Sequence, residues 1–293
     1  MVIASACAAD LNGDGKYGLD DKLGFVVHDR THINGFMNST DVHTYLRNEQ
    51  GEWEYVYGSE ADYENITRLN QLFYHTDGSY YYGGTVAIES EQEGYNEIMN
   101  KFVSGDIFIM TAEMDDAVSL LREMKNDYGI LPMPKADEDQ ENYYSGSRST
   151  HNVFAMPVTT QNADNAGAFM EALSASNHET VLPAYYEIAL KTKYSRDDES
   201  SRMYDIIHDG MMLNFSYLYN GAIGTSAAYE TGLANPDNFM SYIEANRTSL
   251  EANFAKYVEE MEENCLSKKW VSAPAADTFF YRFSLGVQPN SRL

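Results

Sequence analysis

The sequence predicts a globular protein of the α/β class, in which strands and helices alternate along the chain. Of its 293 residues, 43% are hydrophobic and 13% are aromatic, which is enough to build a sizeable core. Short apolar runs of strand length alternate with longer segments in which apolar residues recur at helical spacing. Because a single core rarely organises a chain of this length, we expect two lobes.

Local signals place the first elements of this pattern. Residues 23–27 form an apolar run of strand length. Residues 42–57 alternate around a central turn, which predicts a surface hairpin that carries Trp53. Apolar residues then recur at helical spacing over residues 60–74, so we expect a helix there.

The segment from residue 91 to residue 133 has the most regular pattern in the chain. It predicts, in order, a helix, a strand over residues 107–110, a second helix capped by Asp115 and Asp116, and a strand over residues 128–132. This alternation is typical of layered α/β proteins.

Strand signals become rare in the later part of the chain. After a polar loop over residues 137–149, we expect one more strand over residues 152–157 and a helix from about residue 163 to residue 173. From residue 180 onward the pattern is helical, most clearly at residues 186–190, 203–208 and 250–265. Residues 278–293 lose this pattern, and we expect them to be poorly docked.

The most specific motif of the sequence lies near its start. Residues 10–21 match the calcium-loop pattern D-x-N-x-D-G, followed after five residues by an acidic residue. A calcium ion takes about six to eight oxygen ligands. The predicted ligands are the side chains of Asp10, Asn12, Asp14 and Asp21 and the backbone carbonyl of Lys16.

Two departures distinguish this loop from that of a calcium sensor. It closes with Asp21 rather than with the longer Glu, and the nine residues before it are too few for an amphipathic helix. We therefore expect calcium as a structural cofactor. The alternative is an acidic turn without an ion, because Asn and Asp beside Gly are common turn formers.

The formal net charge of −25 limits the classes of partner. Nucleic acids and anionic membranes are bound through basic patches, and the 20 Lys and Arg residues form no extended cluster in the sequence. No apolar run approaches the roughly eighteen residues of a membrane span. We expect a soluble monomer with no nucleic-acid partner.

Signals for catalytic or zinc chemistry are weak. His28 and His32 are four residues apart, but they follow a predicted strand rather than lie on a helix, and no Glu follows His28 as in H-E-x-x-H sites. With 45 acidic residues, some carboxylate pair will fall at a catalytic spacing by chance, so such a pair does not indicate a glycosidase. We therefore expect that the protein is not an enzyme.

Five segments together resemble a known family through their order and spacing. They are the calcium loop followed by Gly24-Phe25, and residues 102–109, 127–134, 153–157 and 185–197. This combination resembles the extracellular solute-binding proteins of bacterial ABC importers, in particular the sugar- and oligosaccharide-binding group that includes alginate- and maltose-binding proteins.

The resemblance implies a periplasmic-binding-protein-like type II fold, in which two α/β lobes close on a ligand. Residues 1–142 would be mostly the second lobe, residues 143–180 a return segment of the first lobe, and residues 181–293 a mainly helical region bracing both. It also implies an extracellular or periplasmic protein whose N-terminal part, with its export signal, is missing from this chain, so that Met1 is an internal or misassigned start.

Candidate ligand-binding residues follow from the chemistry of sugar receptors, in which aromatic rings stack on pyranose faces and polar side chains bond the hydroxyls. The candidate rings lie in polar or glycine-bearing loops, at residues 80–82, Tyr143, Tyr144, Tyr217 and Tyr219. Arg148 lies close in sequence to two of them and is the candidate polar partner. The alternative for each tyrosine is half-buried packing.

The resemblance adds the turn at residues 111–116, which often contacts ligand in this family. Glu113 and Asp115 are the candidates, with helix capping as the alternative for Asp115. Sugar binders frequently carry a Trp in this turn, so carboxylates here leave room for a cationic, peptide-like or polyol ligand.

The expected function is that of a receptor that delivers a small ligand, most favourably an oligosaccharide, to an ABC permease by hinge closure. The alternatives are a secreted glycoside hydrolase and a calcium-stabilised surface binding module. Dockerin modules carry two calcium loops, whereas this sequence contains one such motif.

Overall fold

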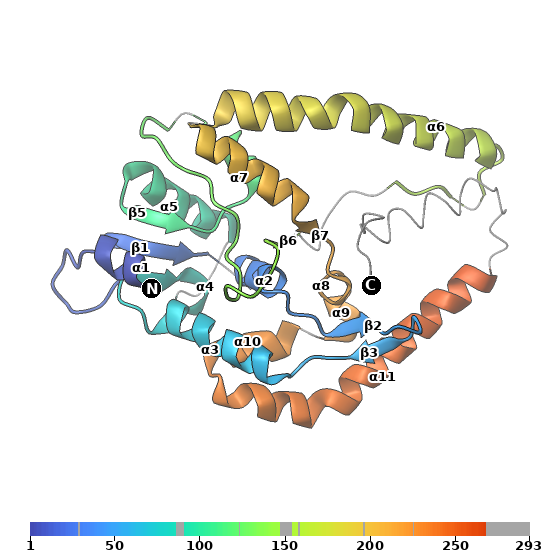
Figure 1. Ribbon diagram of the computed structural model, residues 1–293, viewed down its shortest axis with the longest axis horizontal. Coiled ribbons are helices and arrows are strands. Elements are labelled where there is room, and N and C mark those ends of the chain that lie inside the picture. Colours follow the sequence, from blue (N-terminus) through green and yellow to red (C-terminus); the bar gives the residue numbers. More distant parts are fainter. Residues whose placement is uncertain are drawn as a thin grey trace.

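A small parallel sheet lies at one end of the protein in the computed structural model (Figure 1). The structure describes residues 1–28, 30–85, 91–122, 124–146, 154–157, 159–195, 197–224 and 226–267. The sheet has the strand order β4-β1-β5, with β1 at Leu23–Val27, β4 at Ser79–Tyr81 and β5 at Ile107–Met110. Phe25 pairs with Ser79 on one side and with Ile109 on the other, and both pairings are parallel.

Helices cover both faces of this sheet, as expected for parallel strands, which are rarely exposed on either face. The helices on one side are α2 (Arg30–Ser39), α3 (Glu60–Tyr74) and α10 (Ser226–Ala234), and α5 (Glu91–Ser104) lies on the other. Successive side chains of a strand point to opposite faces of the sheet. Val27 of β1 therefore packs with α2 and α3, whereas Val26 packs with Ile98 of α5. The α/β class predicted from the sequence is confirmed.

The helix α3 shows how its sequence sets both its start and its buried face. The hydroxyl of Ser59 accepts a hydrogen bond from the Asp62 backbone N–H at 3.1 Å, and the Asp62 carboxylate accepts one from the Ser59 backbone N–H at 2.9 Å. This reciprocal pair is a capping box. Ile66, Leu69 and Phe73 then lie on the buried face at helical spacing.

The short helix α1 (Val2–Cys7) packs so closely on β1 that one strand position must be glycine. A Cβ atom at Gly24 would lie 1.8 Å from the carbonyl oxygen of Ala4. The chain reaches the sheet through an antiparallel bridge between Ala9 and Lys22, which closes the neck of residues 10–21.

A hairpin and the last helix form a second packing region. The antiparallel strands β2 (Tyr45–Arg47) and β3 (Trp53–Tyr55) lie against α11 (Asp237–Ser267), as Figure 1 shows. The short helices α8 (Phe215–Leu218) and α9 (Asn220–Ile223) complete this region. Its centre is the stack of Tyr45 on Phe254, with ring centroids 3.7 Å apart.

One long helical segment runs along the side of the molecule (Figure 1). It begins as α6 (Ala163–Ser176) and continues through the π-helical segments η2 (Asn177–Val181) and η3 (Ala184–Tyr194), which are separated by Leu182 and Pro183. Neither α6 nor η2 buries any residue. Among the described residues, the η3 end packs on the body, where Leu190 contacts Tyr204 of α7 (Asp198–Asp209).

The remaining regular elements are short. They are the helix α4 (Tyr82–Thr85), the 3₁₀ turn η1 (Met114–Ala117), and the parallel pair of β6 (Ser145–Gly146) with β7 (Met211–Met212). Among the helices of the described residues, none combines the length and apolar character that crossing a membrane requires.

Most of the predicted elements are confirmed. The structure contains the strands at residues 23–27 and 107–110, the hairpin, the helices at residues 60–74 and 91–104, and the helix from residue 163. The later part of the described chain is mainly helical, as expected. Residues 278–293 lie outside the described residues.

Three predicted elements are wrong or unsupported. The second helix after Asp115 is only the turn η1, and residues 128–132 form no strand, because the Ile130 backbone N–H donates to the Ser200 hydroxyl at 3.1 Å instead of to a neighbouring strand. Residues 154–157 are irregular, and residues 152 and 153 lie outside the described part of the chain.

Candidate functional site

The carboxyl ends of the three parallel strands bring polar residues together at one edge of the sheet. His28 directly follows β1, Tyr82 directly follows β4 and Thr111 directly follows β5. All three are buried. Ligands of open α/β sheets bind outside this edge, because the loops that leave the strands converge there.

Two helices add a second imidazole and a second phenol to this edge. The ring of His32, on α2, lies edge-on to that of His28 at 5.7 Å between centroids, and its Nδ1 lies 2.9 Å from the Thr111 hydroxyl. The ring of Tyr95, on α5, lies 5.2 Å from His28 and 5.4 Å from His32, and Tyr82 lies 5.5 Å from His28. We call His28, His32, Tyr82, Tyr95 and Thr111 the edge cluster.

A buried carboxylate anchors the edge cluster to the turn after β5. The Tyr95 hydroxyl donates a short hydrogen bond to Oδ2 of Asp116, which also accepts the Glu113 backbone N–H at 2.7 Å. Burial, reinforced by the hydrogen bond to Asp116 and by its negative charge, raises the pKa of Tyr95 well above 10. Tyr95 therefore stays a neutral donor, and its bond holds the turn at residues 113–116 against α5.

Tyr82 is held at the same edge by close contact with α5. Its hydroxyl donates to Glu97 Oε2 at 3.3 Å, and burial, together with the Glu97 carboxylate, raises its pKa. A Cβ atom at Gly94 would lie 2.6 Å from the Tyr82 ring, so only glycine allows α5 to approach this closely.

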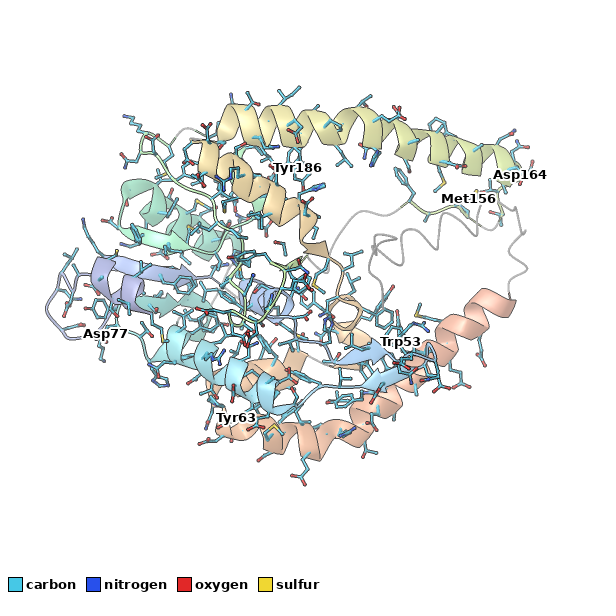
Figure 2. The ribbon with its side chains drawn as sticks, in the orientation of Figure 1. Trp53, Tyr63, Asp77, Met156, Asp164 and Tyr186 are labelled. Atoms are coloured by element: carbon cyan, nitrogen blue, oxygen red, sulfur yellow. The ribbon has the colours of Figure 1, made fainter. Side chains whose placement is uncertain are left out.

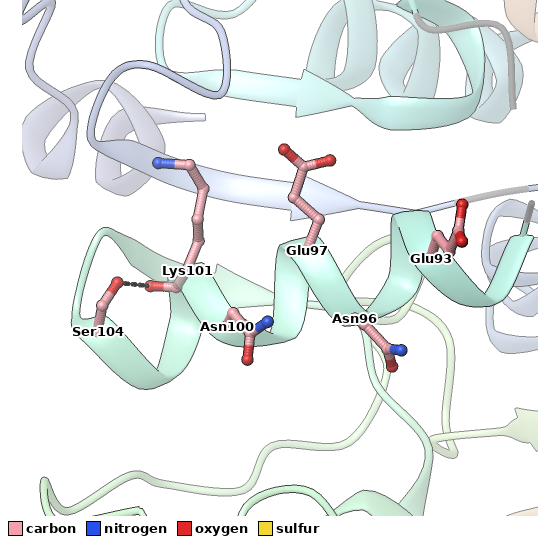
Figure 3. Close-up of a pocket in the computed structure, with 6 residues that line it drawn as sticks. All are labelled: Glu93, Asn96, Glu97, Asn100, Lys101 and Ser104. Atoms are coloured by element: carbon pink, nitrogen blue, oxygen red, sulfur yellow. Dashed lines mark hydrogen bonds between the residues drawn. The ribbon is translucent and has the colours of Figure 1, made fainter.

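The outer surface of α5 carries a shallow hollow of about 530 Å³ (Figure 3). All six residues that line it come from this one helix: Glu93, Asn96, Glu97, Asn100, Lys101 and Ser104. A single helix cannot surround a ligand, so we assign this hollow to the solvated face of α5.

The ligand-binding residues predicted from the sequence lie in three separate places. Glu113 and Asp115 belong to the turn beside the edge cluster. Tyr143 and Tyr144 lie in the loop before β6, and Tyr217 and Tyr219 lie in and just after α8. Arg148 lies outside the described residues.

Only part of this set has the exposure expected of ligand-contacting side chains. Glu113 is half-buried and Asp115 is exposed. Tyr143 is 38% exposed, with the Lys135 ammonium 4.7 Å from its ring centroid, and Tyr144 is half-buried.

The expectation of exposed rings in loops is wrong for two groups of tyrosines. Residues 80–82 are buried, because they form β4 and the start of α4. Tyr217 is only 8% exposed, because it lies on α8, where the Asn214 side chain accepts its backbone N–H. Tyr219 is half-buried. Its ring centroid lies 4.7 Å from that of Phe215 and 5.0 Å from that of Tyr257.

The predicted calcium loop is a series of turns in which carboxylates accept backbone N–H groups. Asp10 accepts from Gly13 at 2.6 Å and from Gly15 at 2.9 Å, and both glycines have positive φ. Asn12 accepts from the Asp14 N–H at 2.9 Å, and Asp14 from the Lys16 N–H at 2.8 Å.

Asp21 closes the base of the loop and is 1% exposed. Its two carboxylate oxygens accept the backbone N–H groups of Gly18 and Leu11, each at 2.9 Å, and these bonds lower the pKa of Asp21. Asp21 therefore stays ionised and ties the two ends of the loop together.

Oxygen-only donors suit calcium, and the positive φ of two glycines suits a tight ligand loop. However, within the described residues no three His, Cys, Asp or Glu side chains form a group that could hold a metal ion.

The loop precedes β1, whereas His28 follows it, and a five-residue strand is about 16 Å long. An ion in this loop would therefore lie at the opposite end of β1 from the edge cluster.

The sequence pattern did not identify the edge cluster as a site. The prediction that His28 and His32 both lie off helices is wrong for His32, which lies on α2. The available signal was position, because polar residues that directly follow buried parallel strands meet at one edge. The contribution of Tyr95 could not be read in this way, since its spacing indicated only an inward-facing helix residue.

In comparisons with protein-family models, with curated proteins and with solved structures, no match to this chain was found.

Proposed function

We propose that the protein is a solute-binding receptor of the ABC-importer type, with a type II two-lobe architecture, that binds its ligand at the edge cluster. The observation that carries this proposal is the convergence of two imidazoles, two phenols and a hydroxyl at the carboxyl edge of a parallel sheet. Imidazoles, phenols and hydroxyls donate and accept hydrogen bonds, which suits a hydroxyl-rich ligand that reaches this edge. An oligosaccharide is the favoured class.

The placement of the motif residues supports this reading. Gly24-Phe25 lies on β1, and residues 102–109 run from the end of α5 into β5, with Gly105 at φ +85° between them. The turn that this family uses for ligand contact corresponds to residues 111–116, which lie beside the edge cluster. Glu113 and Asp115 are the residues of this turn that we propose to reach the ligand.

The long helix also supports a two-lobe arrangement. Phe169 is 68% exposed, Val181 is 56% exposed and Ile188 is 64% exposed, all on the segment from α6 to η3. These side chains leave apolar surface exposed along the segment, which a partner surface would cover. In a two-lobe receptor, the other lobe would cover it, and the η3–α7 junction would lie near the hinge.

Calcium enters the proposal as a structural cofactor. Asp10, Asn12, Asp14 and Asp21 and the carbonyl of Lys16 would hold it, and the ion would stabilise the entry to β1. Because binding to the folded state alone raises stability by mass action, a chelator should lower the melting temperature. An unchanged melting temperature after chelation would contradict a structural ion.

The proposed receptor makes and breaks no bond in its ligand. Its proposed location is outside the bacterial cytoplasmic membrane, and its partner is the permease of an importer. Sequestering the ligand between lobes desolvates it, and the closed form is what the permease would recognise.

Isothermal titration against oligosaccharides, short peptides and polyamines tests the proposal. We expect saturable binding of one class, and weaker binding by the variant His32→Gln, which alters the imidazole beside Thr111. The matched control is His208→Gln, the same substitution on the outer surface of α7. Equal effects of the two variants would contradict binding at the edge cluster, and turnover of a bound ligand would contradict a receptor.

A further inference from the structure

The sequence contains three Asn-Gly pairs, at residues 12–13, 34–35 and 220–221. Asparagine is among the thermolabile residues of proteins. The backbone nitrogen of the residue that follows can attack the side-chain amide, and glycine, which has no Cβ atom, hinders this attack least. The three pairs have the same chemistry, so their reactivity depends on the structure around each of them.

The first pair lies in the exposed loop before β1. Figure 2 shows this loop at the left edge of the molecule. Asn12 and Gly13 are both exposed, and neither belongs to a helix or a strand. Gly13 has φ +75°, and beyond its chain neighbours no atom lies within 4 Å of the position that a Cβ atom would take there. The backbone and the side chain therefore have room to rearrange at this pair.

The other two pairs lie in helices. Asn34-Gly35 belongs to α2, and Asn34 is only 5% exposed. Asn220-Gly221 begins α9, and the Asn220 side-chain oxygen accepts the Ser226 N–H at 2.6 Å. A helix holds ψ at about −42°, so the next nitrogen cannot turn towards the side-chain amide without breaking the helix.

Two hydrogen bonds in the exposed loop prepare the atoms of Asn12 and Gly13 for reaction. The Gly13 N–H donates to Asp10 Oδ1 at 2.6 Å, so a carboxylate is in position to take the proton of the attacking nitrogen. Asn12 Oδ1 accepts the Asp14 N–H at 2.9 Å, so a donor lies where negative charge develops on the amide oxygen during attack. Residues 10–14 thus supply the nucleophile, the proton acceptor and the oxyanion donor.

The next pair in the loop, Asp14-Gly15, repeats this arrangement with a different electrophile. The Gly15 N–H donates to Asp10 Oδ2 at 2.9 Å, and Asp14 Oδ1 accepts the Lys16 N–H at 2.8 Å. The carboxylate of Asp14 is a poorer electrophile than the amide of Asn12 and has no ammonia to release. The arrangement therefore singles out Asn12.

We propose that Asn12 is a site of spontaneous deamidation. The Gly13 nitrogen bonds to Cγ of Asn12, and its proton passes through Asp10 to the side-chain nitrogen, which leaves as ammonia. Water then opens the resulting cyclic imide at either of its carbonyl carbons, so residue 12 becomes aspartate or isoaspartate. The reaction needs only water and is independent of the proposed transport function.

Deamidation changes the tip of the loop and leaves its base intact. The bonds from Leu11 and Gly18 to Asp21 tie the ends of the loop together and do not involve residues 12 and 13. The reaction adds a negative charge at the tip, and the isoaspartate product also lengthens the main chain there. We therefore expect a slow and irreversible change of charge in a protein that stays folded.

Peptide mapping by mass spectrometry tests the proposal on the full chain. The protein is incubated at mildly alkaline pH with a chelator, so that no divalent cation holds the Asn12 side chain. We expect the peptide that contains residue 12 to deamidate at least about tenfold faster than those that contain Asn34 and Asn220, because helical geometry misplaces the nucleophile. Isoaspartate should form at position 12, since direct hydrolysis of the side chain would give aspartate alone.

The variant Asp10→Asn tests the proton acceptor. It keeps an oxygen that can accept the Gly13 N–H but cannot take its proton, so deamidation should slow by about tenfold or more. The matched control is Asp20→Asn, which removes the same charge from an exposed position of the loop and should leave the rate unchanged. The melting temperatures of both variants check that the fold is retained.

Three results would overturn the proposal. They are equal deamidation rates at the three Asn-Gly pairs, aspartate without isoaspartate at position 12, and equal rates in Asp10→Asn and Asp20→Asn. A ligand titration that fails at the edge cluster would affect only the proposed transport function.

Discussion

The helices α3 and α6 are almost equal in length, with 15 and 14 residues, yet they have opposite environments. In α3, Ile66 is fully buried and Phe73 is 3% exposed, whereas α6 buries no residue and leaves Phe169 68% exposed. The helix with fewer charged residues is α6, so composition alone would have placed it inside. The difference teaches that an apolar face is buried only where another element is present to cover it.

The largest expected effect is at the buried helix. Ile66→Ala removes a side chain that packs against α10, where a Cβ atom at Gly232 would lie 3.1 Å from Ile66. We expect a loss of about 2–5 kcal/mol in the free energy of unfolding, because transfer and cavity costs add. Urea denaturation measures it, and a loss below about 1 kcal/mol would contradict tight packing between α3 and α10.

The next largest loss of stability is expected when the hydrogen bond between Tyr95 and Asp116 is removed from the edge cluster. Tyr95→Phe removes the donor to the Asp116 carboxylate, and we expect a loss of about 1.5–3 kcal/mol, the range for bonds to charged groups. Tyr74→Phe on the exposed end of α3 is the control and should have little effect.

The same bond predicts a pH dependence. Since the pKa of Tyr95 is raised in the folded protein, its contribution to stability is complete below pH 10 and is lost as the pH rises beyond that ordinary value. Urea denaturation at alkaline pH should therefore show a smaller alkaline loss in Tyr95→Phe than in the unmodified protein. Identical alkaline losses would contradict the raised pKa.

In the loop before β1, the contribution of Asp21 to stability should depend on pH in the opposite direction. Asp21→Ala leaves the N–H groups of Gly18 and Leu11 without their acceptor, at an expected cost of about 1–3 kcal/mol. Because the pKa of Asp21 lies below its ordinary value of 3.8, its contribution is complete above that pH and is lost as the pH falls through the lowered value. Acid unfolding should therefore be less steep in Asp21→Ala. The neighbouring exposed Asp20, changed to Ala, should retain the acid dependence.

The smallest effect is expected on α6. Phe169→Ala should change the free energy of unfolding by no more than about 0.5 kcal/mol, because the ring is mostly exposed. Urea denaturation of this variant beside Ile66→Ala gives the sharpest contrast between the two helices. A loss comparable to that of Ile66→Ala would show that the α6 face is already covered in this chain.

Local periodicity predicted the elements that depend on nearest neighbours. The helix at residues 60–74 carries its own capping box and apolar stripe, so its bounds could be read directly. Residues 128–132 have the composition of a strand, but the Ile130 N–H bonds to Ser200, seventy residues away. No local pattern contains that partner.

The candidate sites also combine features that the local sequence predicted with features that it could not predict. The turn at residues 111–116 could be singled out because it follows a recognisable strand, but its link to Tyr95 through Asp116 could not. Tyr217 was expected in an exposed position and is buried, because α8 packs it against the body.

By itself, the sequence determined the α/β class, two of the three strands of the sheet, the hairpin and the acidic loop, since each depends on spacing within a few residues. Tertiary structure alone decided that His28, His32, Tyr82, Tyr95 and Thr111 meet at one edge and that Tyr45 and Tyr55 bury their hydroxyls beneath α11. The physical reason is that burial and hydrogen-bond partners depend on elements far apart in the chain. Periodicity sets which face of an element is apolar, and only the fold sets what that face meets.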